Sequence, residues 1–327
     1  MKKYGVAVIG AGVIGTRLSD LFVSSDKTEL ILICDTNQQA AKDLATKHNI
    51  DYTSDINTVF TRNDIDIVYI GVPPKYHHEL TIQALDHGKH VICEKPISLN
   101  SSESESMLLK LSDTGKIGAV NLILRYSLGL NEFKKLLGEG YIGELRRVDI
   151  SLSYENWPRS WQNVAWLSTK EQGGALREVG SHFYFAAQEL FGKIKRVNAI
   201  VQYESDSGAE TGALGTLEFE SGLLCSLNLI IGTPCEDTNS ITAFGSKGKL
   251  SFQGWYQLFG SQSKEELRPI FDKYERSELK LIDDYCMKIE NPNHQANFVT
   301  FKEAANVQEI LDAIYNSNGN WIEINKF

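Results

Sequence analysis

The sequence has few of the features that mark metal sites, disulfide frameworks or membrane spans. Its five cysteines form no C-x-x-C pair, so we expect reduced thiols, no zinc site and no bound metal. No apolar run is long enough to cross a bilayer, and a strand-like run begins almost at once, which predicts a cytoplasmic protein without a signal peptide. Positive charge is in deficit: 33 Lys and Arg against 42 Asp and Glu give a net charge of -9. We therefore expect neither nucleic acid nor a membrane as a partner.

The chain is long enough for two domains, with an expected boundary at 122/123. Over 1–122, strand-like runs alternate with helical patterns, which predicts an α/β Rossmann domain with a parallel, doubly wound sheet. The expected strands are 4–9, 30–34, 67–72, 90–93 and 117–121, and the expected helices are 14–24, 38–48, 77–87 and 102–112. The last helix is expected to begin with a capping box formed by Ser102 and Glu105.

Residues 123–327 have a different pattern, which predicts a substrate-binding and oligomerisation domain of the α+β class with a large, mostly antiparallel open sheet. The expected strands are 145–154, 194–203, 211–220, 223–231, 239–244, 248–254 and 321–324, with helices at 130–137 and 301–315. The polar stretch 257–280 is expected to be an irregular excursion. One face of the sheet is available for helices or for a second subunit.

A glycine-rich turn after the first strand is the strongest local signal. Gly10, Gly12 and Gly15 are spaced as in dinucleotide-binding loops and stand between a strand and a helix. In such loops the first glycine permits the tight turn, the second lets backbone N–H groups approach the pyrophosphate, and the third lets helix and strand pack closely. The anion then binds at a helix N-terminus. The loop and the residues after its central glycine, Val13 and Ile14, are therefore predicted to bind the cofactor.

Asp35 ends the second strand, about 20 residues after the last glycine, where a carboxylate can accept hydrogen bonds from the adenosine ribose. A carboxylate repels a 2′-phosphate, and no arginine follows directly. The sequence therefore predicts NAD rather than NADP as the cofactor. Since Thr36 and Asn37 come next, an alternative is that Asp35 only caps a helix or a turn.

Two further strand ends carry candidate residues, because ligands of such sheets bind beyond the carboxyl ends of the strands. After the third expected strand come Val72, Pro73, Pro74 and His77, and after the fourth come Glu94 and Lys95. His77 is interpreted as a cofactor contact or as a surface turn residue. Glu94 and Lys95 could form only a solvated salt bridge, but their place at the cofactor edge makes Lys95 a catalytic candidate.

In the second domain the unusual stretch is 157–182. Glu178 and His182 are four residues apart, so on a helix the carboxylate would orient the imidazole; an ordinary helical ion pair is the alternative. Three tryptophans could form a pocket wall that stacks on an apolar ring face, or could belong to the core at the domain interface. The candidate substrate contacts are Arg125, Tyr126, Trp157, Arg159, Trp161 and Trp166.

These motifs together resemble the Gfo/Idh/MocA family, the relatives of glucose–fructose oxidoreductase and inositol dehydrogenase. The resemblance is carried by the glycine motif, Asp35, the two strand ends, Arg125 and the run from Gly173 to His182. It implies a nicotinamide cofactor, a sugar, polyol or sugar-phosphate substrate, and dimers or tetramers built through the second-domain sheet. Where the family usually has aspartate, this chain has Glu178, whose side chain is one methylene longer.

The resemblance and the residues lead to one main hypothesis, an NAD(H)-dependent oxidoreductase acting on a secondary alcohol or ketone of a carbohydrate. His182 is expected to accept the hydroxyl proton with Glu178 orienting it, while Lys95 holds the substrate oxygen; Lys95 as the base is the alternative. Two other functions stay open. One is C=N or C=C reduction, or a hydrolysis that recycles NAD, and the other is a non-catalytic NAD-binding regulator.

Overall fold

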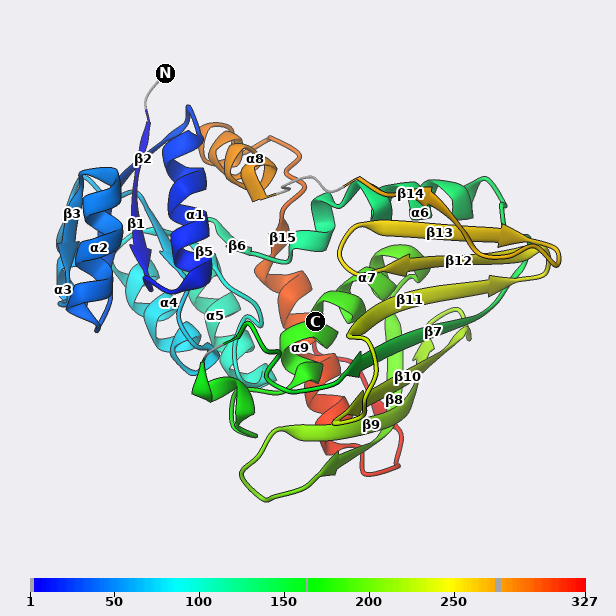
Figure 1. The fold of residues 1–327 in the computed structure, drawn as a ribbon. Helices are drawn as coiled ribbons and strands as arrows, with labels where there is room; N and C mark the ends of the chain where they lie inside the picture. Colours follow the sequence, from blue (N-terminus) through cyan, green and yellow to red (C-terminus); the bar gives the residue numbers. More distant parts are fainter. Residues whose placement is uncertain (1–2, 163, 274–277) are drawn as a thin grey trace. The chain divides into compact units, whose positions relative to one another are not determined.

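The computed structural model describes residues 3–162, 164–273 and 278–327. The chain folds into two compact units, each of which we describe by itself (Figure 1). One comprises Met1–Leu122 with Arg276–Ala305, and the other comprises Ile123–Glu275 with Asn306–Phe327. In the described part of the chain, no helix has both the length and the apolar character that crossing a membrane requires.

The first unit contains a seven-stranded sheet in the order β15-β6-β5-β4-β1-β2-β3, parallel except for β15. Its strands β1 and β4 are buried almost throughout, as expected for a parallel sheet covered on both faces. The strand order reverses direction between β1 and β4, which is where ligands of such sheets bind. The strands are β1 Tyr4–Ile9, β2 Thr28–Cys34, β3 Asp51–Thr53, β4 Ile67–Ile70, β5 His90–Cys93, β6 Gly118–Val120 and β15 Val299–Thr300.

The helices of this unit pack beside one another in two groups. Asp20 of α1 accepts a hydrogen bond from Lys47 of α2, and Asp86 of α4 accepts one from Lys110 of α5, both at surface positions. The helices are α1 Val13–Ser24, α2 Gln38–His48, α3 Ile56–Thr61, α4 His77–Asp86, α5 Ser101–Thr114 and α8 Glu278–Glu290, with a 3-10 turn η1 at Pro74–Tyr76. The predicted Rossmann fold is confirmed, although β3 and α3 were not predicted.

The start of α5 differs from the prediction. Its N-cap is Asn100, whose side-chain oxygen accepts the Glu103 N–H at 3.0 Å, while the Glu103 carboxylate accepts the Leu99 N–H at 3.0 Å. The expected box of Ser102 and Glu105 is therefore wrong. Asparagine caps helices as well as serine does, and the cap lies two residues earlier than expected; the Glu103 carboxylate accepts the N–H of the residue before the N-cap and not that of the N-cap itself.

The described residues 278–305 lie with the first unit, whereas the sequence-based boundary placed them with the second. On α8, the Tyr285 hydroxyl donates to the carbonyls of Val91, at 2.9 Å, and Ile117, at 2.6 Å. β15 pairs with β6 in the same sheet. These contacts join residues that are far apart in the sequence, which a division by local pattern does not detect.

The second unit contains a nine-stranded sheet in the order β14-β13-β12-β11-β7-β10-β9-β8-β16. All neighbours are antiparallel except β7 and β10, so the predicted mostly antiparallel sheet is confirmed. The strands are β7 Leu145–Tyr154, β8 Ile194–Tyr203, β9 Glu210–Phe219, β10 Leu224–Ile231, β11 Thr238–Gly245, β12 Gly248–Gln253, β13 Gln257–Gln262, β14 Arg268–Phe271 and β16 Ile322–Glu323.

The expectation that the stretch 257–280 is irregular is wrong in part. This stretch contains the hairpin β13–β14. Half of the β13 residues are buried and β14 is largely exposed, so the polar composition of the hairpin suits strands near a sheet edge. Residues 274–277 of that stretch lie outside the described residues, and α8 begins at Glu278.

Helices cover one face of this sheet, and alternate strand residues point to the other face. On that other face Ile200 of β8 and Leu214 of β9 are direct cross-strand partners, and they are 58% and 65% exposed. The helical segments are η2 Ile123–Tyr126, α6 Leu128–Gly138, η3 Ala165–Ser168, the π-helical turn η4 Leu176–Gly180, α7 Ser181–Phe191 and α9 Phe301–Asn316.

Candidate functional site

The glycine loop joins β1 to α1, and each glycine has a distinct environment. A Cβ on Gly15 would lie 1.8 Å from the Gly10 carbonyl oxygen, and one on Gly10, where φ is +103°, would lie 2.3 Å from the Gly71 oxygen. These two glycines are required by close backbone packing. At Gly12, by contrast, no heavy atom beyond its own chain neighbours lies within 4 Å of an added Cβ. Gly12 thus leaves open space at the N-terminus of α1, where Val13 is 73% exposed and Ile14 is half-buried.

Asp35 follows β2 and links the glycine loop to the next turn. One carboxylate oxygen accepts the Ala11 N–H at 2.7 Å, and the other accepts the Asn37 N–H at 2.7 Å. Asn37, not Asp35, is the N-cap of α2. The aspartate therefore stands at the mouth of the glycine loop, where the sequence placed it, and it also stabilises the turn that the alternative interpretation described.

Glu94 joins the carboxyl ends of three adjacent strands. Its buried carboxylate accepts hydrogen bonds from the Tyr69 hydroxyl on β4, from Asn121 Nδ2 after β6 at 2.6 Å, and from the Lys95 N–H at 3.2 Å. Burial, and after it the charge of Glu94, raises the pKa of Tyr69, so the phenol stays a donor. Glu94 was predicted to bind the cofactor, but the contacts that the structure gives it are structural. They fix the backbone from which Lys95 extends.

His77 connects the two candidate strand ends of this unit. The ring is fully buried, with Nδ1 2.7 Å from the Pro96 carbonyl oxygen and Nε2 2.8 Å from the Val72 oxygen. Burial lowers the pKa of His77, and the two carbonyl acceptors oppose that shift. Both nitrogens face the backbone, so His77 links the two loops, and its full burial does not fit the alternative of a surface turn residue. Its contact with a dinucleotide stays a prediction. Pro73 and Pro74 stand between its two partners in the sequence, at the start of η1.

In the second unit, Glu178 and His182 lie on either side of a change in helix type. Glu178 is half-buried on the π-helical turn η4, whereas His182 is in α7 and is 4% exposed. The segment is helical, as the proposed pairing of the two residues requires, but Glu178 lies in a π turn, in which residue i bonds to i+5. That the carboxylate orients the imidazole stays a prediction. The sequence also did not indicate Trp255, whose ring meets the His182 ring edge-to-face at 5.2 Å.

The candidate substrate residues separate into two groups. Arg125, on η2 with Tyr126, donates to Glu189 of α7 at 3.2 Å and stacks on the Phe185 ring at 4.9 Å, so its charge is balanced within the unit. Arg159 instead stacks on aromatic rings, with its Cζ 4.7 Å from the centroid of Trp161 and 5.6 Å from that of Trp157.

The three tryptophans do not form one wall. Trp157 is half-buried and its indole N–H donates to the Leu167 carbonyl at 3.0 Å, while Trp161 is 63% exposed. Trp166 is half-buried on η3 and accepts the Thr169 hydroxyl through its carbonyl oxygen. Trp157 and Trp161 share a neighbour, Arg159.

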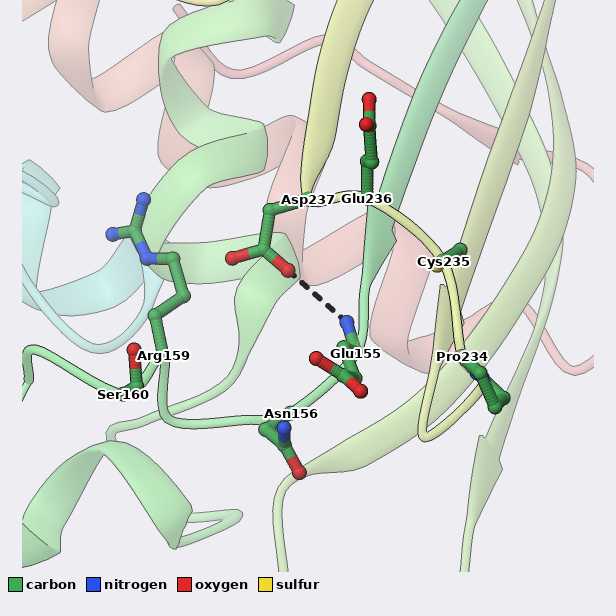
Figure 2. Close-up of a pocket in the computed structure, with 8 residues that line it drawn as sticks. All are labelled: Glu155, Asn156, Arg159, Ser160, Pro234, Cys235, Glu236 and Asp237. Atoms are coloured by element: carbon green, nitrogen blue, oxygen red, sulfur yellow. Dashed lines mark hydrogen bonds between the residues drawn. The ribbon is translucent and has the colours of Figure 1, made fainter.

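Arg159 also lines a cavity of about 520 Å³ (Figure 2). The opposite side is the 234–237 turn between β10 and β11, where the Asp237 carboxylate accepts the Glu155 N–H at 3.1 Å. Three carboxylates and one guanidinium make the lining net negative. The charged lining residues are Glu155, Arg159, Glu236 and Asp237, and Cys235 lies among them.

Comparison with protein families gives a match in each half of the chain. Residues 4–122 match the model described as an oxidoreductase family with an NAD-binding Rossmann fold. Residues 130–251 match the GFO/IDH/MocA C-terminal domain. The two models cover most of the chain. The first includes the glycine loop and Lys95, and the second includes Glu178 and His182.

Individual relatives act on carbohydrates, as their names state. A 2,7-anhydro-N-acetylneuraminate hydratase of Mediterraneibacter gnavus is 25% identical over 58% of this chain, which spans about half (48%) of that relative. A dTDP-3,4-didehydro-2,6-dideoxy-alpha-D-glucose 3-reductase of Streptomyces violaceoruber is 26% identical over 73% of this chain and 69% of its own. Among solved structures, levoglucosan dehydrogenase with NADH and levoglucosan has a TM-score of 0.85 at 21% identity over 99% and 100% of the two chains, a similarity of fold.

The contacts of His77 lead to a prediction on dinucleotide affinity. Replacing it in His77→Ala removes the link between the Val72 and Pro96 carbonyls, so we expect NADH to bind about 10-fold more weakly, equivalent to about 1.4 kcal/mol. The measurement is a titration of NADH fluorescence. The matched control is His78→Ala, since His78 bonds only to Ser106 at the surface. Equal affinity of both variants would show that the link has no role in cofactor binding.

Proposed function

The chain belongs to the GFO/IDH/MocA oxidoreductase family, and on that premise we propose that it transfers hydride between a nicotinamide and a secondary alcohol or ketone of a sugar, polyol or sugar derivative. The observation that carries the proposal is the position of Lys95. It follows a buried strand at the carboxyl edge of the parallel sheet, and Glu94 and His77 fix its turn from two sides. A positioned cation at that edge suits an oxygen that gains negative charge during the reaction.

The first unit suits a dinucleotide in two respects. The open space at Gly12 lets a pyrophosphate approach the N-terminus of α1, whose first-turn N–H groups favour an anion. Asp35 already lies at the loop and can accept from ribose hydroxyls, and its charge disfavours a 2′-phosphate. We propose NAD in preference to NADP. When bound, the nicotinamide supplies the hydride acceptor or donor, and the protein supplies position and proton transfer.

The proton and the substrate oxygen are assigned to two side chains. His182 accepts the hydroxyl proton as the carbinol carbon loses its hydride, and it returns the proton in the reverse direction. Lys95 donates a hydrogen bond to the same oxygen and stabilises its developing charge. The carboxylate of Glu178, four residues before His182, stabilises the imidazolium. The alternative assignment, with Lys95 as the base, exchanges the first two roles.

The cavity beside Arg159 suggests the charge of the substrate. Its lining has three carboxylates to one arginine, so a phosphate or carboxylate group would be repelled on balance. Carboxylates accept hydrogen bonds from sugar hydroxyls, and Trp161 offers an exposed ring face for the apolar side of a sugar. We therefore propose an uncharged or amino-substituted carbohydrate in preference to a sugar phosphate.

A second candidate function is supported by hydratase relatives such as that of Mediterraneibacter gnavus. In this version the hydride taken from the substrate returns to it after a water molecule has been added or lost, so NAD is recycled and no NADH is released. The same residues serve both versions. Product formation with no change in NADH absorbance would distinguish the second from the first.

Substitution of the two proposed catalytic side chains tests the main proposal. We expect Lys95→Ala and His182→Ala each to lower kcat about 100-fold or more on the best sugar or polyol of a panel, because each removes a group acting on the reacting oxygen. Lys110→Ala, at a surface ion pair, is the control. NADH absorbance gives the rate and NADH fluorescence shows that dinucleotide still binds. Full turnover of His182→Ala with none for Lys95→Ala would reverse the assignment, and silence across the panel with intact binding would favour a regulator.

Cofactor choice is tested at Asp35. We expect Asp35→Ser to raise kcat/KM with NADP relative to NAD by at least about 10-fold, since the charge that repels the 2′-phosphate is gone. Asp43→Ser on the exposed side of α2 is the matched control. An unchanged ratio in Asp35→Ser would contradict the assignment of Asp35 to the ribose.

We also propose a homodimer or homotetramer that covers the outer face of the second sheet. The support is the exposed cross-strand pair Ile200 and Leu214, since apolar side chains exposed together on a sheet face are typical of contact surfaces. We expect Leu214→Lys to lower the mass measured by light scattering after gel filtration. Leu109→Lys, which changes an exposed leucine of α5, is the control. A monomeric wild type would contradict the proposal.

A further inference from the structure

The π-helical turn Leu176–Gly180 is the segment of the second unit that most needs support. A π turn has poor hydrogen-bond geometry and persists only where its surroundings hold it, often at functional sites. It follows Gly174, where φ is +95°, and it leads directly into α7. The turn carries Glu178, and His182 comes two residues after it. Whatever fixes the start of this turn therefore also fixes His182, to which we assigned the proton, and Glu178, to which we assigned the stabilisation of the imidazolium.

Glu210, the first residue of β9, contacts that start. It is 2% exposed, and its Oε1 accepts the Leu176 N–H at 2.7 Å. A Cβ on Gly174 would lie 2.1 Å from Oε2, so the carboxylate packs against the bare backbone of that glycine. A buried carboxyl group is costly without partners, and this one has a backbone N–H at the head of the turn. Neither contact is visible from sequence spacing, because 34 residues separate Glu210 from Leu176.

The other groups that act on Glu210 come from four elements. Arg177 of η4 is buried, and its Nη1 donates to the Gly173 carbonyl at 2.7 Å. Burial raises the pKa of Glu210 to about 7, while the Leu176 N–H and the charge of Arg177 act in the opposite direction. Three phenols, whose own pKa values are raised by burial and then by the Glu210 charge, complete the surroundings: Tyr184 of α7, Tyr203 of β8 and Tyr315 of α9.

The far end of the turn is packed just as closely. A Cβ on Gly180 would lie 2.6 Å from the Tyr184 hydroxyl, so that phenol rests on the last residue of the turn. Two residues on, the ring of His182 lies against Trp255. A displacement at Leu176 is therefore transmitted through a short, fully packed segment to the imidazole, with no flexible loop between them.

We propose that Glu210 is a positioning residue for Glu178 and His182, which it holds in place through its bond to the head of the π-helical turn. The role of those two side chains rests on the proposed function, whereas the bond itself does not. The carboxyl form suits the buried position, since its raised pKa means that the folded protein prefers Glu210 protonated. The contribution of Glu210 to the free energy of unfolding is therefore full at acid pH, and this contribution is lost as the pH rises through about 7.

Two variants separate the bond from the charge. Glu210→Gln keeps an oxygen for the Leu176 N–H and cannot ionise, so it imitates the protonated form, whereas Glu210→Leu removes the acceptor. The matched control is Glu218→Gln on the same strand, where the carboxylate accepts from Arg196 at 2.7 Å at a half-buried position. The variants are compared as the full chain between pH 5 and pH 8.

Hydrogen exchange followed by mass spectrometry gives the first readout and needs no substrate. We expect Glu210→Leu to exchange about 10-fold or more faster than wild type over 174–184, at every pH. In wild type, protection corrected for the intrinsic rate falls as the pH rises through about 7, and in Glu210→Gln it does not. Between pH 5 and pH 8 the unfolding equilibrium constant of wild type rises on the order of 100-fold relative to that of Glu210→Gln.

The fluorescence of Trp255 gives the second readout, because a protonated imidazole quenches an adjacent indole. The difference between each protein and its Trp255→Phe counterpart isolates this signal. We expect the pH titration of this Trp255 fluorescence signal to lose amplitude in Glu210→Leu. In Glu210→Gln the titration should lose only the step near pH 7, and in Glu218→Gln it should be the same as in wild type. A merely structural role for Glu210 would lower stability and leave this titration as in wild type.

The outcomes are distinct. If exchange over 174–184 and the Trp255 titration are the same in Glu210→Leu as in wild type, the inference is overturned, whatever the carbohydrate panel shows. If both respond as expected while no carbohydrate is turned over, the proposed function fails and the control of the His182 segment by Glu210 stands. Where turnover is found, kcat and not the KM for NAD should follow the same pH dependence in wild type and lose it in Glu210→Gln.

Discussion

A single buried carboxylate, that of Glu94, organises the cofactor side of the first unit. It ties together the ends of β4, β5 and β6 through Tyr69, Asn121 and the backbone of Lys95. Parallel strands bring their carboxyl ends to one edge, but they do not by themselves fix the loops that follow. With His77 connecting the next pair of loops, the backbone that carries Lys95 is held from both sides. Pre-organisation of this kind is what the proposed chemistry requires.

Much of the fold could be predicted, and the gaps have physical causes. Buried parallel strands such as β1 and β5 are continuous apolar runs, and the glycine loop marks the change from strand to helix, so the Rossmann unit was clear. The hairpin β13–β14 was missed because edge strands bury few side chains and show little periodicity. The place of α8 was missed because it is decided by tertiary contacts such as those of Tyr285.

For the candidate site, sequence indicated the residues but not their partners. Asp35, Lys95 and His182 could be chosen because motifs place them after strands or on a helix. The contact of Trp255 with His182 and the hydrogen bond of Glu210 with Leu176 join residues that are far apart in the sequence. Both depend on the tertiary structure of the second unit, so no local sequence pattern indicates them. The assignments themselves stay predictions. What the structure adds is the set of neighbours, and those of His77 and Glu94 show that both side chains hold the loops around Lys95.

The position of Cys235 has a practical consequence. Of the five cysteines, all within the described part of the chain, it alone is exposed, and it lies in the turn that lines the cavity. Burial raises the pKa of the thiols of Cys34, Cys93, Cys225 and Cys286, which keeps them unreactive. Air oxidation during storage can therefore cross-link two molecules at this point only. A dye or spin label attached through a maleimide would likewise report from a single, known place.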